Sequence, residues 1–168
     1  MASGVEVDDE AVNLFTDMKM RKYTETPDGK KIRKKAVVFC INGDKIVTEA
    51  DKEILSVDDD EEHEDPLKRF INLLPENGCR YALYDAAYET EDNKKCQDLV
   101  FVMWSPDTCG VRDKMLYASS KDAIRKKFTG LKHNWEVKGR EDLENRCTVA
   151  DKLRGHGACL KTLEGKPL

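Results

Sequence analysis

The chain has 168 residues, a formal net charge of −4, 37% charged residues and 39% hydrophobic residues. This length favours one domain, and the apolar share, though below the roughly 45–50% of an average domain, suffices for a single compact core. No apolar run approaches the roughly 18 residues of a membrane span, and the acidic start lacks the basic and apolar regions of a secretory signal. We therefore expect an intracellular protein and exclude an integral membrane protein.

A helix is predicted close to the N-terminus. Apolar residues at positions 11, 14, 15 and 18 repeat with helical spacing, and Asp8 or Asp9 can cap the first turn. Residues 1–6 precede this cap, and we expect them to form a mobile tail.

A hairpin and a second helix follow. Residues 36–41 form an apolar run typical of a buried strand, and Asn42-Gly43 favours a tight turn. We expect residues 45–49 to return antiparallel to the first strand. An acidic loop over 58–65 then leads to a helix over 67–74, where apolar residues again have helical spacing.

The C-terminal half predicts two long strands and the longest helix. Residues 80–88 and 99–104 have strong strand patterns, and the polar link between them suits a hairpin. A helix runs from about residue 112 to residue 128 and stops before Gly130. The remaining predicted elements are a strand over 131–137, a helix over 149–153 capped by Thr148, and an edge strand over 158–163. Together they predict an antiparallel-dominated sheet with helices on its faces, of the α/β or α+β class.

The six cysteines predict free thiols rather than a metal site or a disulfide framework. Zinc ligands recur at short Cys and His spacings, and the sequence has no CxxC pair. Disulfide frameworks belong to short secreted chains. Cys40 follows apolar strand residues and is expected to be buried, whereas polar neighbours predict that Cys96 and Cys109 are exposed.

Motifs for catalysis are missing from the sequence. It has no GxGxxG, GxxxxGK[ST], GxSxG or HExxH pattern, and it has only three histidines. We therefore expect no enzyme activity, no cofactor and no metal. A Cys–His nucleophilic pair stays open as an alternative, because such partners meet in space without being close in sequence.

Charge is segregated along the chain. Residues 19–35 have a local charge of +6, residues 51–65 of −8 and residues 112–132 of +5. Two basic blocks separated by an acidic one could steer an anionic partner, although each block could also be a solvated face. The sequence pI near 5.5 and the lack of interleaved aromatic residues argue against nucleic acid as that partner.

The first basic block contains a candidate nuclear localisation patch. Its members are Lys30, Lys31, Arg33, Lys34 and Lys35, and Ile32 interrupts it. The alternative is a solvated entry into the first long strand.

The long predicted helix is a candidate docking surface. Met115 is an adaptable apolar side chain, and Arg112 and Lys114 flank it. A basic helix with a small apolar stripe can dock into a groove whose rim is acidic. The alternative is that this helix only packs on its own sheet.

Residues 114–127 carry the most informative pattern in the chain, Lys-Met-Leu-Tyr-Ala-Ser-Ser-Lys-Asp-Ala-Ile-Arg-Lys-Lys. This stretch resembles the long actin-binding helix of the ADF/cofilin family. Further similar stretches, in the family's order, are residues 1–5, 33–37, 79–85, 98–101 and 163–168. The resemblance covers nearly the whole chain and is to the vertebrate type of cofilin.

The resemblance implies the ADF-homology fold, a central mixed and mostly antiparallel sheet sandwiched between helices. It implies one domain over 1–168, with residues 1–6 as a mobile regulatory tail. It also implies a protein that binds monomeric and filamentous actin, prefers ADP-actin, and severs and depolymerises filaments. The location implied is cytoplasmic and cytoskeleton-associated, with nuclear entry as an option.

The same resemblance implies which residues contact actin. The surface used with both monomers and filaments would comprise Ser3, Gly4, Val5, Arg112, Lys114, Met115, Ser119, Ser120 and Leu153. The additional surface used with filaments would include Arg80, Lys95 and Asp98.

Three forms of regulation are implied as well. Phosphorylation of Ser3 by a kinase, reversed by a phosphatase, would add about −1.5 to −2 charge to an acidic tail. His133, near Asp98, would sense pH close to neutrality. Phosphoinositide headgroups would compete with actin for a basic set formed by Arg112, Lys114, Lys126, Lys127 and Lys132.

Three departures from the family pattern affect the expected severing. The segment Lys94-Lys95-Cys96-Gln97-Asp98 is one residue longer and less acidic than its family counterpart, the Leu-Gly-Gly pattern is replaced by residues 153–157, and Asn134 replaces an acidic residue. The alternative is therefore a family member that mainly sequesters monomers or decorates filaments with weak severing. A thiol-dependent enzyme is the alternative from another class.

Overall fold

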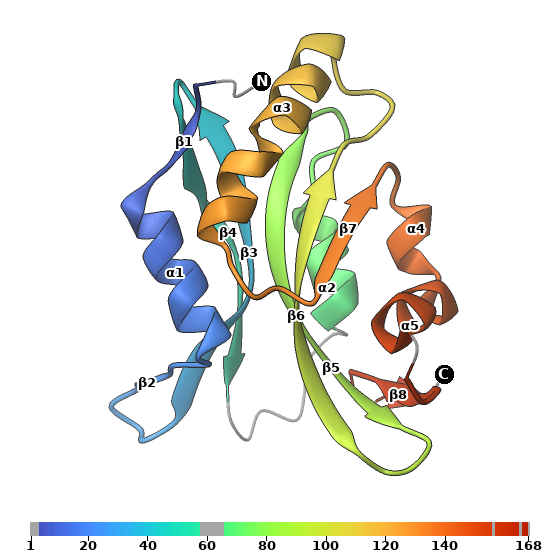
Figure 1. Ribbon diagram of the computed structural model, residues 1–168. Helices are drawn as coiled ribbons and strands as arrows, with labels where there is room; N and C mark the ends of the chain where they lie inside the picture. The colour runs from blue at the N-terminus through green and yellow to red at the C-terminus, as the bar shows by residue number, and fades with distance from the viewer. Residues whose placement is uncertain (1–3, 58–65, 156, 165, 168) are drawn as a thin grey trace.

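The computed structural model describes residues 4–57, 66–155, 157–164 and 166–167 (Figure 1). Within these residues a mixed sheet of nine strands has the main order β1-β4-β3-β5-β6-β7. The strands are β1 (Glu6–Val7), β2 (Thr24–Glu25), β3 (Lys31–Asn42), β4 (Lys45–Val57), β5 (Arg80–Thr90), β6 (Lys95–Trp104), β7 (His133–Val137), β8 (Leu160–Leu163) and β9 (Lys166–Pro167). The helices are α1 (Asp9–Lys19), α2 (Pro66–Leu73), α3 (Val111–Lys127), α4 (Glu141–Glu144) and α5 (Arg146–Arg154). None of these helices has both the length and the apolar character needed to cross a membrane.

The hairpin predicted from Asn42-Gly43 is confirmed between β3 and β4, although its two turn residues are Gly43 and Asp44. Gly43 has a φ of +65°, a left-handed conformation that glycine adopts at little cost, and Asn42 pairs with Lys45 across the turn. Both strands are longer than predicted. Their outer ends contain polar residues that pair between the two strands, and polar residues do not give a strand pattern in the sequence. The acidic loop predicted over 58–65 lies outside the described residues.

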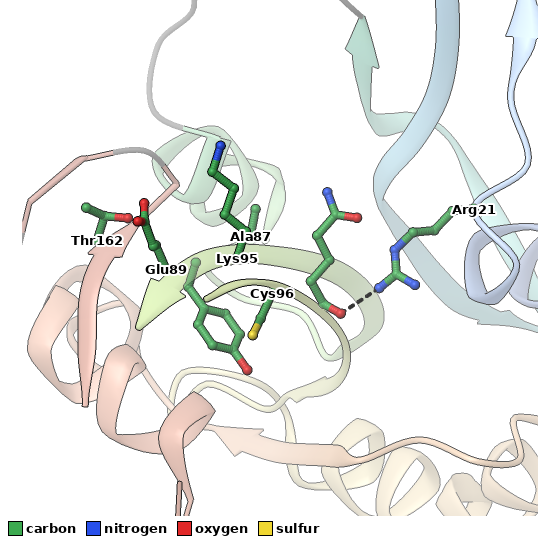
Figure 2. A pocket seen from close by; sticks show the side chains of 8 residues that line it. Arg21, Ala87, Glu89, Lys95, Cys96 and Thr162 are labelled. Carbon is green, nitrogen blue, oxygen red and sulfur yellow. Dashed lines mark hydrogen bonds between the residues drawn. The ribbon is translucent and has the colours of Figure 1, made fainter. Parts of the chain in front are cut away.

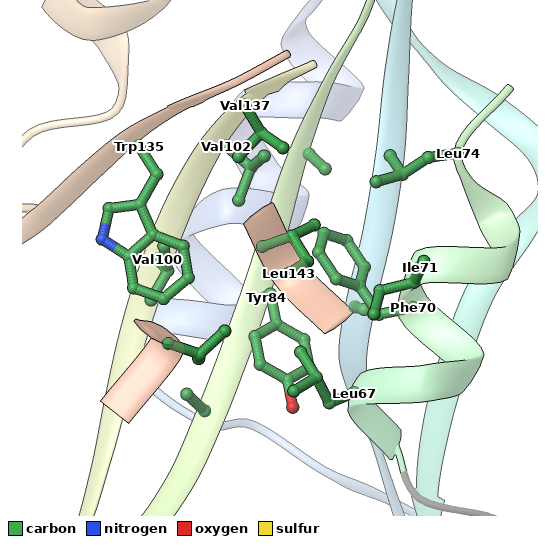
Figure 3. Close-up of a cluster of buried hydrophobic side chains, with 14 of the residues drawn as sticks. Leu67, Phe70, Ile71, Leu74, Tyr84, Val100, Val102, Trp135, Val137 and Leu143 are labelled. Carbon is green, nitrogen blue, oxygen red and sulfur yellow. The ribbon is translucent and has the colours of Figure 1, made fainter. Parts of the chain in front are cut away.

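Two hydrophobic cores lie on opposite faces of the sheet, because alternate strand residues point to opposite sides. On one face, Val37 and Phe39 pack with Phe15 of α1 and with Phe128 at the end of α3. The rings of Phe15 and Phe128 stack with centroids 4.5 Å apart. The other face, shown in Figure 3, is covered by α2, α4 and α5 through Leu67, Phe70, Ile71, Leu74, Leu143, Val149 and Leu153. The expected sheet sandwiched between helices is thus confirmed.

Helix α3 connects two parallel neighbours, β6 and β7, across one face of the sheet (Figure 1). Its buried residues Tyr117, Ser120 and Ile124 recur every three or four positions, the spacing of one helix face. The helix predicted over about 112–128 is confirmed to within a residue at each end. The strand predicted over 131–137 is also confirmed, although it begins at His133.

Val5 and Glu6 are fixed in the structure rather than mobile. Glu6 pairs in parallel with Lys45, its amide donates to the carbonyl oxygen of Asp44 at 2.9 Å, and Val5 is buried. The expected mobile tail over 1–6 is therefore wrong for these two residues, because Glu6 pairs with β4 and Val5 is buried. Residues 1–3 lie outside the described part of the chain.

Helix α5 begins earlier than predicted and has a different cap. The side-chain oxygen of Asn145 accepts hydrogen bonds from the amides of Cys147 at 3.1 Å and Thr148 at 3.3 Å. Asn145 rather than Thr148 is therefore the N-cap, in the role that asparagine commonly has.

The structure differs from all three predictions about thiol exposure. Cys109 is buried, because the loop before α3 folds against the start of β5, where Cys79 is also buried. Cys40 is half-buried rather than buried, and Cys96 is half-buried rather than fully exposed.

Candidate functional site

The outer face of α3 carries two apolar side chains that the fold does not bury. Val111 is 72% exposed and Met115 is 67% exposed, and four positions separate them, about one helical turn. Arg112 and Ser119 are exposed beside them. Adjacent large apolar side chains among exposed polar ones are typical of a protein-binding surface. We call Val111, Arg112, Met115 and Ser119 the α3 surface.

The opposite face of α3 is fixed to the sheet. The hydroxyl of Tyr117 accepts a hydrogen bond from the amide of Ile41 at 2.9 Å, and the hydroxyl of Tyr81 donates to the carbonyl oxygen of Tyr117. Burial raises the pKa of Tyr117 above its usual value, so this phenol stays neutral. The α3 surface is therefore presented on a helix whose orientation is set by buried contacts.

The start of the chain lies beside α3. Strand β1 contacts α3 directly, and Figure 1 shows it next to the beginning of the helix. Gly4 is exposed with a φ of +80°. Ser3 lies outside the described residues.

Four of the predicted actin-contacting residues are not available as free surface. Ser120 and Leu153 are 0% and 1% exposed, and Val5 is 8% exposed. Lys114 is half-buried, and its ammonium donates to the carbonyl oxygen of Asp107 at 3.2 Å. Direct contact of Ser120, Leu153 and Val5 with actin stays a prediction, which their burial in this structure does not favour. Sequence spacing indicates this burial for Leu153, since Val149, Ala150 and Leu153 form one apolar stripe of α5.

Sequence reasoning missed Val111 as a surface residue. The expected helix began one residue later, so Val111 was not placed on its outer face. The signal available was its position four residues before Met115, which puts the two side chains on the same stripe of a helix.

The five residues predicted to bind phosphoinositides do not form one cluster. Arg112 and Lys126 are fourteen positions apart on α3, a distance of about 21 Å along the axis. Lys126, Lys127 and Lys132 lie at the other end of the helix and are exposed, Lys132 with 71% of its side chain. We call Lys126, Lys127 and Lys132 the basic end of α3.

Asp98 and His133 are in contact, as predicted. His133 Nε2 lies 3.0 Å from Asp98 Oδ2, and the Tyr88 hydroxyl donates to the same oxygen at 2.7 Å. Burial acts to raise the pKa of Asp98, but these two hydrogen bonds and the charge of Lys132 outweigh it, so that this pKa is lower than usual. His133 itself is buried against Trp135.

The residues predicted for filament contact occupy two ends of the β5–β6 hairpin. Arg80 pairs with Trp104 and Lys95 pairs with Glu89, nine positions apart on β5, which corresponds to roughly 30 Å. Arg80 is half-buried, and its Nε donates to Glu49 Oε2 at 2.8 Å. The structure therefore does not bring Arg80 together with Lys95 and Asp98. The segment 94–98, expected to be one residue longer than its family counterpart, causes no register shift in the pairing of β5 with β6 from Arg80 to Glu89.

Lys95 lines a hollow at the tip region of that hairpin (Figure 2). The hollow has a volume of about 500 Å³. The guanidinium of Arg21 closes one side by donating to the carbonyl oxygen of Gln97 at 2.8 Å. Its other lining residues are Ala87, Tyr88, Glu89, Cys96 and Thr162. In the part of the chain that the structure describes, no group of His, Cys, Asp or Glu side chains could hold a metal ion.

The basic patch over 30–35 is not a free cationic cluster. Arg33 pairs with Asp85, Lys34 pairs with Glu53, and buried Lys35 pairs with Glu164. Lys30 and Lys31 are exposed. The nuclear localisation patch stays a prediction, which the ion pairs of Arg33, Lys34 and Lys35 within the fold do not favour.

Comparison with known proteins gives a consistent result. The model of the family described as "Cofilin/tropomyosin-type actin-binding protein" matches residues 4–154. The chain is similar to the cofilin of Streptomyces griseoflavus, at 28% identity and a TM-score of 0.67, with 91% of this chain and 98% of that one covered. It is similar to actin depolymerization factor 2 of Plasmodium berghei, at 25% identity and a TM-score of 0.69, with coverage of 89% and 96%. It is also similar to the ADF of Toxoplasma gondii, at 33% identity and a TM-score of 0.52, with coverage of 85% and 97%.

Proposed function

We propose that this chain, which belongs to the cofilin/tropomyosin-type family of actin-binding proteins, binds an actin monomer through the α3 surface. The observation that carries the proposal is the exposure of Val111 and Met115, at 72% and 67%, on a helix fixed from behind. Exposed apolar side chains lose unfavourable contact with water when a partner covers them. Arg112 supplies a cation at the edge of this patch for an acidic rim.

The test compares two exposed methionines. Met115→Ala is expected to weaken binding of monomeric actin about 5- to 30-fold, equivalent to about 1–2 kcal/mol. Met20→Ala is the matched control, because Met20 is 64% exposed but lies at the end of α1. The Met20→Ala variant should bind monomeric actin as tightly as the unchanged protein, as measured by the fluorescence of labelled actin. Equal effects of both substitutions would contradict the assignment of the α3 surface.

Filament severing and depolymerisation form the second part of the proposal. Asp98, Lys95 and Arg80 contribute from separate parts of the β5–β6 hairpin, so a bound filament would be contacted over an extended area. A protein with higher affinity for one filament geometry shifts the filament toward that geometry. Fluorescence microscopy of single filaments distinguishes severing from the alternative, monomer sequestration or decoration with weak severing. New filament ends should appear along the length of a filament if severing occurs.

Phosphorylation of Ser3 is proposed as an inhibitory modification. Ser3 precedes β1 by three residues, which span at most about 10 Å, and β1 contacts α3. A phosphate near the α3 surface would add about −1.5 to −2 charge and repel an acidic partner. Ser3→Glu should lower co-sedimentation with actin, whereas Ser3→Ala should not. Undiminished binding of the Glu variant would count against this control.

Phosphoinositides and pH are proposed as further controls. The basic end of α3 offers an exposed cationic surface for anionic headgroups. The His133–Asp98 contact places an imidazole against a carboxylate at the start of β7. His133→Tyr should remove the difference in severing between two pH values near neutrality, and a preserved difference would contradict the pH proposal. The vertebrate type of the family resemblance stays a prediction.

A further inference from the structure

Two buried cysteines from distant parts of the sequence meet at one side of the sheet. Cys79 Sγ lies 2.8 Å from Cys109 Sγ, and the residues are 0% and 5% exposed. Cys79 comes directly before β5, and Cys109 comes two residues before α3. A disulfide has an S–S distance of about 2.05 Å, so an approach of about 0.8 Å would bring these sulfur atoms to bonding distance.

The segments that carry the two thiols are already joined by hydrogen bonds. The indole N–H of Trp104 donates to the carbonyl oxygen of Pro75 at 2.6 Å. The hydroxyl of Thr108 donates to the carbonyl oxygen of Glu76 at 2.5 Å. These contacts hold the end of β6 and the loop after it against the segment before β5, close in sequence to both thiols. Bond formation between the sulfur atoms therefore requires no new approach of the two loops.

We propose that Cys79 and Cys109 are an oxidation site at which hydrogen peroxide forms a reversible intramolecular disulfide. In a reducing compartment both thiols stay free, since intracellular disulfides of this kind are commonly transient and redox-sensing. The bond would tie the loop that leads into α3 to the start of β5. The proposal concerns this thiol pair alone and does not depend on actin binding.

Cys109 is the thiol that meets the oxidant. It is the less buried of the two. Burial and the hydrogen bond with Cys109 raise the pKa of Cys79 to about 12, so Cys79 keeps its proton at neutral pH. Hydrogen peroxide is small enough to reach a nearly buried sulfur during minor movements of the 105–110 loop.

The reaction has two balanced steps. The Cys109 thiolate attacks one oxygen of the peroxide and the O–O bond breaks, which gives a sulfenic acid and a hydroxide that takes up the proton lost by Cys109. The sulfur of Cys79 then attacks the sulfur of Cys109, the S–O bond breaks, and the proton of Cys79 leaves with the hydroxyl group as water. Two thiols lose two electrons in total, and one peroxide is reduced to two waters.

Cys40 is the competing partner that the experiment must distinguish. The pKa of Cys40 is raised by burial and by the nearby carboxylate of Glu49, and Cys40 lies near the end of β3, opposite Val47. The direct sulfur contact of Cys79 is with Cys109. Oxidation should therefore select Cys109 rather than Cys40 as the partner of Cys79.

The test maps the disulfide in the full chain after treatment with hydrogen peroxide. The monomer fraction is denatured in an alkylating agent, digested without reduction and analysed by mass spectrometry. Trypsin leaves Cys96 and Cys109 on one fragment, so a Cys96→Ser variant is oxidised in parallel. The expected product joins the Cys79 peptide to the Cys109 peptide in both proteins and disappears on treatment with dithiothreitol. Methionine sulfoxide, which peroxide also forms, survives that reductant.

Two variants complete the design. Cys109→Ser should leave Cys79 fully alkylated after oxidation, whereas Cys147→Ser, which removes an exposed thiol outside the pair, should give the same cross-link as the unchanged chain. A cross-link from Cys79 to Cys40 or Cys96 would overturn the proposal. Full alkylation of both Cys79 and Cys109 in the oxidised native chain would overturn it as well, and that result does not depend on how any variant folds.

Discussion

Lys35 Nζ lies 3.0 Å from Glu164 Oε2, and both side chains are buried. The ammonium of Lys35 also donates to the carbonyl oxygen of Asp85 at 2.7 Å. The other carboxylate oxygen of Glu164 accepts hydrogen bonds from the Tyr84 hydroxyl at 2.5 Å and the Ala87 amide at 3.0 Å. A charged pair with its hydrogen bonds satisfied thus joins β3 to the turn that follows β8.

Removal of one member of this pair should destabilise the protein strongly. Lys35→Met leaves the Glu164 carboxylate buried without its cation, so we expect the free energy of unfolding to fall by about 3–5 kcal/mol. Urea denaturation measures this change. The matched control is Lys34→Met on the same strand, whose partner Glu53 is exposed, with an expected loss of about 1 kcal/mol or less. If both variants lose the same free energy of unfolding, the buried pair contributes no more to stability than the exposed pair.

Asp98 should contribute stability that depends on pH. Its pKa in the folded protein is lower than the usual value of 3.8, so the folded state favours the charged carboxylate. This stability is fully present above about pH 3.8 and is lost as the pH falls below that value through the folded-state pKa. Asp98→Asn should therefore lower the free energy of unfolding by about 1–3 kcal/mol at neutral pH.

The difference in the free energy of unfolding between Asp98→Asn and the unchanged protein should narrow as the pH falls below about 3.8, and the narrowing should be complete below the lowered folded-state pKa, where both side chains are neutral. Urea titrations above and below this pH measure it. Tyr88→Phe is an informative companion, because it removes one donor to Asp98 and should raise the folded-state pKa of that carboxyl, so that the narrowing is complete at a higher pH. A difference that stays constant down to low pH would refute the hydrogen-bonded carboxylate as its source.

The cap of α5 should be detectable by a pair of alanine substitutions. Asn145→Ala removes the acceptor for two amides and should cost about 1 kcal/mol of stability. Thr148→Ala, at the position that sequence alone favoured, should cost less than about 0.5 kcal/mol. Thermal unfolding of both variants measures these costs, and the reverse order would contradict the Asn145 cap.

The basic end of α3 should bind anionic lipid surfaces separately from the α3 surface. Replacement of Lys126 and Lys127 by Gln should lower partitioning onto phosphoinositide vesicles by about 30-fold, since each lysine near such a surface contributes about 1 kcal/mol. The matched control replaces Lys30 and Lys31, which are exposed and carry the same charge. Monomeric actin binding should persist in the first variant, because Lys126 lies about 21 Å from Arg112 and the screening length is about 10 Å. Equal losses on vesicles for both pairs would indicate only a general charge effect.

Elements with strong local patterns were predictable from sequence. The β3–β4 turn follows from Asn42-Gly43, and α3 follows from an apolar and small-residue stripe that ends before Gly130. Strand ends were less predictable, because residues 31–35 look like a solvated basic run. Their partners Asp85 and Glu164 are distant in sequence, so only the folded chain shows that these cations belong to a strand.

The candidate site was predictable in part for a similar reason. Met115 and Arg112 were correctly expected on the outer face of α3, where helical spacing decides exposure. Cys109 was expected to be exposed because its neighbours are polar, and Ser120 was a surface residue only by the family resemblance, yet both are buried by contacts made in the tertiary structure. The contact between His133 and Asp98 required the parallel pairing of β6 with β7, which no local pattern specifies.

The crossover of α3 between two neighbouring parallel strands lowers the entropic cost of covering its outer face. Because β6 and β7 hold both ends of the helix, its backbone is ordered before any partner arrives. A partner that covers Val111 and Met115 therefore loses little affinity to the ordering of this surface. The amides of α3 should also exchange with deuterium only in rare, large-scale openings of the protein. A bound partner should slow this exchange only because it stabilises the folded state as a whole, and not because it orders the helix.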